Sequence, residues 1–133
     1  MDYRLDVCRG NHLPEIIDPS PEAIEKAINE LLPMKNHFVI LDSEKKVENC
    51  SYIQTIISDD KGHEDDVPQI TFCVELRFNY DKPLFKQYKT YVSDIDLVKK
   101  MFRMFALGIV PDVTGWIDIT EEMNELSRKK KEE

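Results

Sequence analysis

Glu75 and Arg77 are the side chains of this sequence whose types and spacing come nearest to reactive chemistry. They stand two residues apart in a stretch that alternates apolar and polar residues, so both should point to one face of a strand. We expect Tyr88 or Lys86 to lie beside them on the neighbouring strand. A carboxylate next to a tyrosine could act as a general acid or base. The same residues could instead form cross-strand pairs on a solvated sheet, or contact a partner.

The other reactive residue types are scattered along the chain. The three histidines lie far apart, in or beside predicted turns, and none has a partner at metal-ligand spacing. Cys8, Cys50 and Cys73 form no CxxC pair, and we interpret them as reduced residues of the core or of strands. No phosphate-binding loop and no GxSxG motif occurs. The sequence therefore predicts no catalytic residue, no metal site and no cofactor.

Two further features have both a structural and a functional interpretation. Residues 59–66 form a strongly acidic run that ends in Asp65 and Asp66 and lacks the ligand spacing of a calcium loop. A solvated loop is the simpler interpretation, and electrostatic steering of a basic partner is the functional one. Trp116, the single tryptophan, either completes the core or anchors an interface.

Length and charge restrict the class of protein. The chain has 133 residues and a formal net charge of -8, which favours basic partners and disfavours nucleic acid. We discount the basic segment at residues 128–131 as a nucleic-acid patch, because two glutamates follow it. No run approaches the roughly 20 apolar residues of a membrane helix, and the first residues do not resemble a signal peptide. We expect a cytoplasmic protein that binds neither nucleic acid nor membrane; its oligomeric state stays open.

The elements that must position these residues follow from local patterns. Alternation or short apolar runs predict strands over residues 2–8, 38–41, 51–57, 70–78 and 85–92. Ser20 and Pro21 predict the start of one helix, and Ser93 predicts the start of another, which Gly108 ends. Turns are expected at residues 42–46 and 79–83.

This order of elements predicts the fold class. We expect an α+β fold with a mostly antiparallel meander sheet and two main helices packed on one face. It should form a single domain over residues 1–120, and a short C-terminal helix with a frayed charged tail should follow over residues 121–133. The face of the sheet away from the helices should be a partly open, polar surface.

With these elements in place, the chain resembles a family of small bacterial immunity proteins, which protect a cell from its own polymorphic or contact-dependent toxins. The resemblance runs from about residue 19 to residue 118, and the order and spacing of its elements carry it. These elements are Pro19-Ser20-Pro21-Glu22, Tyr52-Ile53-Gln54, Val74-Glu75-Leu76-Arg77, the aromatic strand around Tyr88, the helix from Ser93 to Gly108, and Trp116-Ile117-Asp118, which looks like the family's late Trp-x-acid element. The chain departs from this pattern in a longer acidic loop before Pro68 and in extra residues between Gly108 and Trp116.

The resemblance implies a protein that binds and neutralises a cognate toxin, such as a basic nuclease-like domain, without catalysis. It implies partner contacts on the open sheet face and the acidic loop, at Glu75, Arg77, Tyr88, Asp65, Asp66, Tyr52, Gln54 and Trp116. Two alternatives stay open. One is a small-ligand or regulatory binding domain with a pocket between the helices and the sheet. The other is an enzyme with a carboxylate–tyrosine site, which would need Glu75 in a concave pocket.

Overall fold

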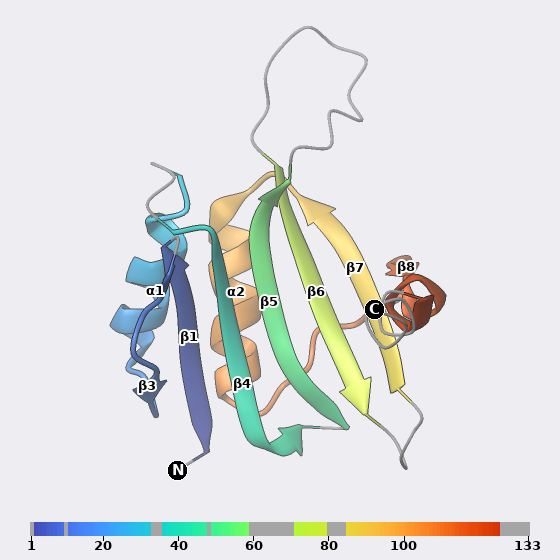
Figure 1. Ribbon diagram of the computed structural model, residues 1–133, viewed down its shortest axis with the longest axis horizontal. Helices are drawn as coiled ribbons and strands as arrows, with labels where there is room; N and C mark the ends of the chain where they lie inside the picture. Colours follow the sequence, from blue (N-terminus) through green and yellow to red (C-terminus); the bar gives the residue numbers. More distant parts are fainter. Residues whose placement is uncertain are drawn as a thin grey trace, which may run out of the picture.

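The computed structural model shows an antiparallel sheet with two helices on one of its faces (Figure 1). It describes residues 2–9, 11–32, 36–47, 49–58, 71–79 and 85–125. The strands lie in the order β2-β1-β4-β5-β6-β7-β8, and β3 also pairs with β1. Their bounds are β1 Tyr3–Arg9, β2 Asn11–His12, β3 Ile16–Ile17, β4 Phe38–Val47, β5 Cys50–Ser58, β6 Thr71–Asn79, β7 Phe85–Val92 and β8 Ile117–Asp118. The predicted α+β class and antiparallel meander are confirmed.

Helix α1 (Pro21–Asn29) begins where the sequence predicts. Oγ of Ser20 accepts a hydrogen bond of 3.1 Å from the backbone N–H of Ala23. This bond satisfies one of the amide groups that the first turn of a helix leaves without a partner, and Pro21 occupies a position where no N–H is needed.

Helix α2 (Ile95–Ala106) begins one residue away from the predicted cap. Asp94, and not Ser93, is its N-cap, because Oδ1 of Asp94 accepts a hydrogen bond of 2.9 Å from the N–H of Asp96. Gly108 follows the helix with a φ of 86°, a left-handed conformation that glycine adopts without steric cost. The predicted end of the helix is therefore confirmed.

The hydrophobic core lies between the helices and the sheet. Ile28 of α1 and Phe102 and Phe105 of α2 are fully buried there. The sheet contributes a matching set of fully buried residues, which are Val39, Leu41, Ile53, Val74 and Leu76. Burial of a side chain of this size stabilises a fold by about 1.5–3 kcal/mol. This apolar layer therefore holds the helices against the sheet. The residues that alternate with it along each strand point to the opposite face.

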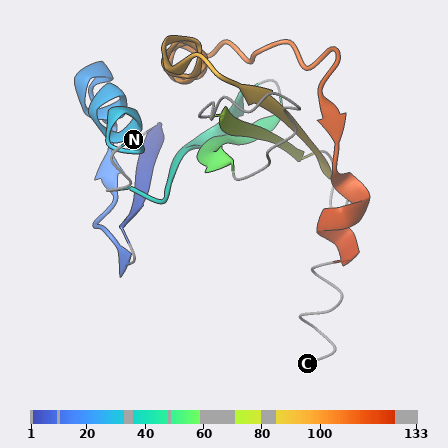
Figure 2. The same ribbon diagram turned by 90° about the horizontal axis from the view of Figure 1, so that it is seen from above.

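The two helices cover the same side of the sheet, as the view from above shows (Figure 2). In this view the sheet is curved, and its β1 and β8 ends bend away from the helices. In Figure 1 the sheet lies in front of the helices, so that view looks onto the uncovered face. We call this uncovered face the open face.

The structure differs from the sequence prediction at several connections. Residues 42–46 belong to β4 and are not a turn; the register shifts between Asp42 and Val47, and Asn49 makes the turn with a φ of 68°. The two-residue strands β2, β3 and β8 were not predicted, because so short a segment shows no periodicity. The acidic run at residues 59–66 and the connection at residues 80–83 lie outside the described residues.

The chain continues beyond β8 into a helical segment over residues 120–125. This segment begins one residue before the predicted helix, and the predicted tail from residue 126 lies outside the described part of the chain. Neither α1 nor α2 has the length and apolar character that crossing a membrane would require, and the same holds for the other described residues.

Candidate functional site

The open face is built from three rows of side chains that run across the strands. In the first row Arg4, Asp42, Tyr52, Arg77 and Gln87 are register partners on successive strands from β1 to β7. The second row contains Asp6, Ile40, Gln54, Glu75, Lys89 and Ile117. The third contains Cys8, Phe38, Ile56, Cys73 and Tyr91. Side chains in register on neighbouring antiparallel strands share a face, so these rows define one continuous surface.

Glu75 lies at the centre of a hydrogen-bond network on this face. Nε2 of Gln87 donates to its Oε1 at 3.1 Å, and Nε2 of Gln54 donates to its Oε2 at 3.4 Å. The hydroxyl of Tyr52 reaches across β6 and donates to Oε1 of Gln87 at 3.5 Å. Gln87 is only 2% exposed, so it forms the buried support of the network. Three side chains from the two neighbouring strands thereby hold the carboxylate of Glu75 in a fixed position.

Two cations flank Glu75, and each lies over an aromatic ring. The guanidinium carbon of Arg77 is 4.0 Å from the centre of the Phe85 ring, and Nζ of Lys89 is 5.4 Å from the centre of the Tyr91 ring. Both distances are within the range of a cation–π contact. Among the described residues, no lysine or arginine nitrogen lies within 4.0 Å of the Glu75 carboxylate. Glu75 therefore accepts amide hydrogen bonds without an ion pair from this part of the chain.

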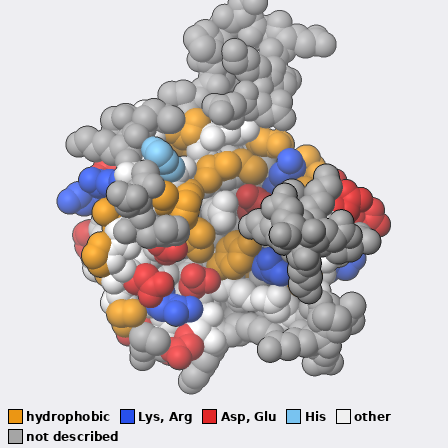
Figure 3. Space-filling model, viewed as in Figure 1, with side chains coloured by type: hydrophobic (Ala, Val, Ile, Leu, Met, Phe, Trp, Pro, Cys, Tyr) orange, Lys and Arg blue, Asp and Glu red, His pale blue; other side chains and the backbone are white. Residues whose placement is uncertain are grey.

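Apolar side chains accompany this polar network. Phe38, Ile40 and Ile56 are half-buried on the face. Tyr91 and Ile117, nearer the β8 edge, are 36% and 48% exposed. Figure 3 looks onto the face and shows hydrophobic side chains over its middle, with charged side chains between and beside them. A mixture of exposed apolar area and fixed polar groups is typical of surfaces that bind another protein.

The β1 end of the face carries a cluster of charges around Asp42. Burial raises the pKa of the Asp42 carboxyl above its usual value; the positive charge of Arg4 opposes this change, and the negative charges of Asp6 and Glu15 add to it. Nε of Arg4 is buried and has no hydrogen-bond partner among the described residues. That end of the face therefore carries both positive and negative groups, and some of them are partly removed from water.

The structure corrects the predicted surroundings of Glu75. The prediction that Tyr88 or Lys86 lies beside it is wrong, because the cross-strand partners of Glu75 and Arg77 are Lys89 and Gln87. Tyr88 is the partner of Leu76 and packs against the core on the helix side, with its ring 5.9 Å from that of Phe78. The carboxylate–tyrosine pair with Tyr88 therefore does not exist in this fold.

The other predicted contact residues lie in different parts of the chain, and only some of them are on the open face. Tyr52, Gln54 and Arg77 lie on the open face with Glu75, as expected. Trp116 is half-buried and packs against the core, in agreement with its structural interpretation. Asp65 and Asp66 lie outside the described residues. The sequence prediction missed Gln87 and Lys89. Alternation along residues 85–92 indicates that these two side chains share a face opposite to Tyr88, but only the register shows that this face is that of Glu75.

Tyr52 and Cys73, two titratable groups of the face, keep their protons near neutral pH. Burial raises the pKa of Tyr52, although Arg77 and Gln87 act against that change, so its phenol keeps its proton near neutral pH. Burial also raises the pKa of the Cys73 thiol to about 11, which disfavours the reactive thiolate. The described residues contain no group of three His, Cys, Asp or Glu that could hold a metal ion.

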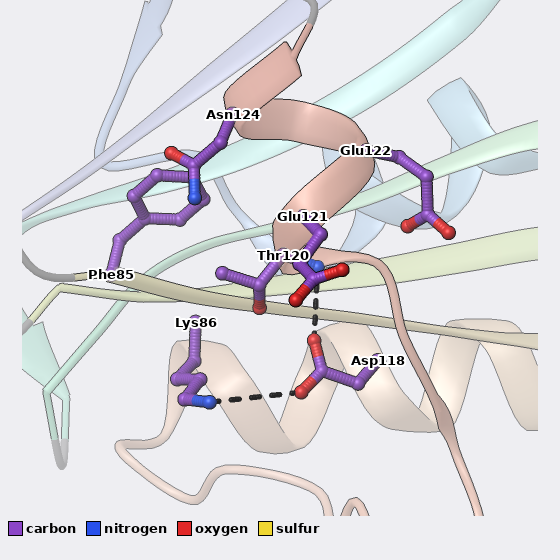
Figure 4. Close-up of a pocket in the computed structure, with 7 residues that line it drawn as sticks. All are labelled: Phe85, Lys86, Asp118, Thr120, Glu121, Glu122 and Asn124. Atoms are coloured by element: carbon purple, nitrogen blue, oxygen red, sulfur yellow. Dashed lines mark hydrogen bonds and ion pairs between the residues drawn. The ribbon is translucent and has the colours of Figure 1, made fainter.

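A separate pocket of about 430 Å³ lies at the β7 edge, beside the helical segment over residues 120–125. Figure 4 shows Lys86 directed toward Asp118, with 3.8 Å between Nζ and Oδ2. Oδ1 of Asp118 accepts a hydrogen bond of 2.9 Å from the N–H of Thr120. Hydrogen bonds from Thr120 are the main reason that the pKa of Asp118 is lowered, and Lys86 adds to the effect. Asp118 thus fixes the start of this segment, and we assign the pocket no function.

Comparisons with protein-family models, with curated proteins and with solved structures found no match to this chain.

Proposed function

We propose that this chain binds and neutralises a bacterial toxin by direct contact, without catalysis, and that the open face is the contact surface. The observation that supports the proposal is the network around Glu75. It presents a positioned carboxylate with no ion pair from the described residues, beside exposed apolar side chains such as Ile117. Such a surface gains by covering its apolar area and by supplying the missing cation.

The charge of the chain is consistent with a basic partner. A formal net charge of -8 attracts a positively charged domain over distances of roughly a Debye length, about 8–10 Å at physiological salt. This attraction raises the association rate more than the affinity. The resemblance of residues 19–118 to immunity proteins makes a toxin, such as a nuclease-like domain, the partner class that we propose. We propose that the two proteins meet in the cytoplasm.

The proposal predicts that a toxin gene neighbours the gene of this chain, and co-expression with the product of that gene tests it. We expect the chain to restore growth and to form a 1:1 complex whose association slows as salt increases. Tyr91→Arg and Ile117→Arg place a bulky positive charge on the open face, which repels a basic partner. They should weaken the complex by at least about tenfold, or about 1.4 kcal/mol. Leu97→Arg is the matched control, because Leu97 is 41% exposed on α2, in the helix layer.

Two results would contradict this proposal in different ways. Failure to restore growth or to form a complex would exclude toxin neutralisation. Loss of the complex in Leu97→Arg, with normal binding by both open-face variants, would move the contact surface to the helices.

The cavities of the structure give little support to the alternative of a small-ligand binding domain. The pocket of about 430 Å³ lies at the β7 edge, and a second cavity of about 60 Å³ lies between α1 and α2, near Pro21 and Leu107. Neither of these two cavities lies between the helices and the sheet, where the alternative would place its ligand.

A further inference from the structure

We infer that Glu75 is the receptor for one arginine side chain of the protein partner. This inference rests on the proposed function, and it names the chemical group that the centre of the open face recognises. Three observations carry it: the missing ion pair, the arrangement of the two carboxylate oxygens, and the engagement of both neighbouring cations elsewhere.

The first observation is a half-buried carboxylate that no described cation contacts directly, although the charge of Glu75 acts on Lys89 from a greater distance. Glu75 is of intermediate exposure, and no described lysine or arginine nitrogen comes within 4.0 Å of its carboxylate. Partial removal of a carboxylate from water is unfavourable unless hydrogen bonds or an opposite charge compensate. The amide hydrogen bonds from Gln54 and Gln87 compensate part of this cost, and a cation from a partner would add the opposite charge.

The second observation is the geometry of the acceptor. Gln87 donates to Oε1 and Gln54 donates to Oε2, so each oxygen already holds one amide hydrogen bond. Each carboxylate oxygen can accept about two hydrogen bonds, which leaves one acceptor position on each oxygen. Two acceptor positions side by side match the two parallel N–H groups of a guanidinium, whereas the ammonium of lysine offers a single point charge.

The third observation explains why the chain does not fill this site itself. Arg77 occupies the next position of the open face on β6, and Lys89 is the direct cross-strand partner of Glu75. Arg77 lies over the Phe85 ring at 4.0 Å, and Lys89 lies near the Tyr91 ring at 5.4 Å. Both cations therefore have an aromatic partner, and the carboxylate between them stays available.

Titration with small amides tests the inference without the partner. The isotopically labelled full chain is titrated with N-acetyl-arginine amide, and the side-chain amide signals of Gln54 and Gln87 are followed by NMR. N-acetyl-citrulline amide has nearly the same shape without the charge, and N-acetyl-lysine amide has the charge without the planar fork. We expect saturable shifts with the arginine amide, several-fold weaker binding of the lysine amide, and no saturation with the citrulline amide.

Variants assign the binding to Glu75. Glu75→Gln keeps the side-chain size and should raise the dissociation constant for the arginine amide by about tenfold, the loss of one charge-assisted pair. Glu122→Gln, at an exposed glutamate outside the network, should leave it unchanged. Gln54→Ala keeps the carboxylate but removes one of its two amide donors. It should weaken binding by about two- to threefold, because Gln87 still holds the other oxygen.

The outcomes separate this inference from the proposed function. Equal shifts with the arginine and citrulline amides, or unchanged binding by Glu75→Gln, would overturn the inference. So would a toxin complex whose affinity is the same for Glu75→Gln and for the unmodified chain, although toxin neutralisation would then still stand. Conversely, arginine binding through Glu75 without any toxin complex would keep the guanidinium site and exclude the proposed function.

Discussion

Nε2 of Gln87 donates a hydrogen bond of 3.1 Å to Oε1 of Glu75, and it does so from a position that is almost closed to solvent. A buried carboxamide has a high cost if it loses its partners, because it cannot exchange them for water. Gln87 also accepts from the hydroxyl of Tyr52, so it links β7 to both β6 and β5. Its side chain therefore stabilises the sheet and also positions Glu75.

Replacement of Gln87 by methionine should destabilise the fold by about 1–2 kcal/mol, the usual cost of removing one partner of a buried hydrogen bond. Methionine keeps the length of the side chain, so little of this loss should come from packing. Gln54→Met is the control: Gln54 is only half-buried and its bond to Glu75 is longer, at 3.4 Å. Urea unfolding followed by circular dichroism measures both. Equal losses for the two variants would show that Gln87 has no special structural role.

The cap of α2 gives a second matched pair of variants. Asp94 accepts the hydrogen bond from the N–H of Asp96, whereas Ser93 is exposed and precedes the cap. Asp94→Ala should therefore cost about 0.5–2 kcal/mol of stability, and Ser93→Ala should have an effect smaller than about 0.5 kcal/mol. Chemical unfolding curves decide between the two residues. A larger loss of stability for Ser93→Ala than for Asp94→Ala would show that Ser93 is the N-cap, as the sequence pattern predicts.

These cases show which parts of the fold the sequence predicts. The strands around Val74 and Leu76 were identifiable because alternation records which face is buried, and Ser20 was identifiable because its helix start has few alternatives. The antiparallel pairing of β6 with β7 was also identifiable, and the structure confirms it. The register of that pair was not, because the connection between the strands sets it, and a shift of one residue moves every side chain to the other face. Tyr88 was placed beside Glu75 for that reason.

The site shows the same division. Glu75, Arg77, Tyr52 and Gln54 follow from alternation within β5 and β6, and the structure places them together. The burial of Gln87 and its contacts with Glu75 and Tyr52 depend on the pairing of β5, β6 and β7 together. No local pattern in the sequence predicts that a polar side chain will be 2% exposed, because its burial comes from neighbours that are distant in the chain.

The thiols of Cys50 and Cys73 should be unreactive in the folded chain. Burial raises the pKa of Cys50 to about 12 and that of Cys73 to about 11. At pH 8 the thiolate fraction of Cys50 is then about 10⁻⁴, and the thiolate is the species that reacts. We expect slow labelling of both residues by a water-soluble disulfide reagent in buffer, and rapid labelling in 6–8 M urea. Single Cys→Ser variants assign the signals. Fast labelling of Cys73 without denaturant would mean that the open face gives the reagent access to its third row.

Asp42 should make stability depend on pH in the opposite direction from an ordinary paired carboxylate. Its pKa in the folded chain is raised from the usual value of 3.8, first by burial and further by Asp6 and Glu15, with Arg4 acting against the change. The folded chain therefore holds this proton at pH values where the unfolded chain has released it. Its contribution to stability is complete below pH 3.8 and is lost as the pH rises through the raised value.

Asp42→Asn removes this titration, so the variant should gain stability relative to the unmodified chain as the pH rises from about 3.5 to 7. Asp112→Asn is the control with the opposite sign, because hydrogen bonds from Thr114 lower the pKa of Asp112. That variant should lose stability relative to the unmodified chain as the pH rises through the lowered pKa of Asp112 to its usual value of 3.8, since the charged form is the one that the fold favours. Urea unfolding at a series of pH values measures both differences. If the two differences run in the same direction, burial does not control the ionisation of Asp42, and the charge cluster at the β1 end of the open face is solvated.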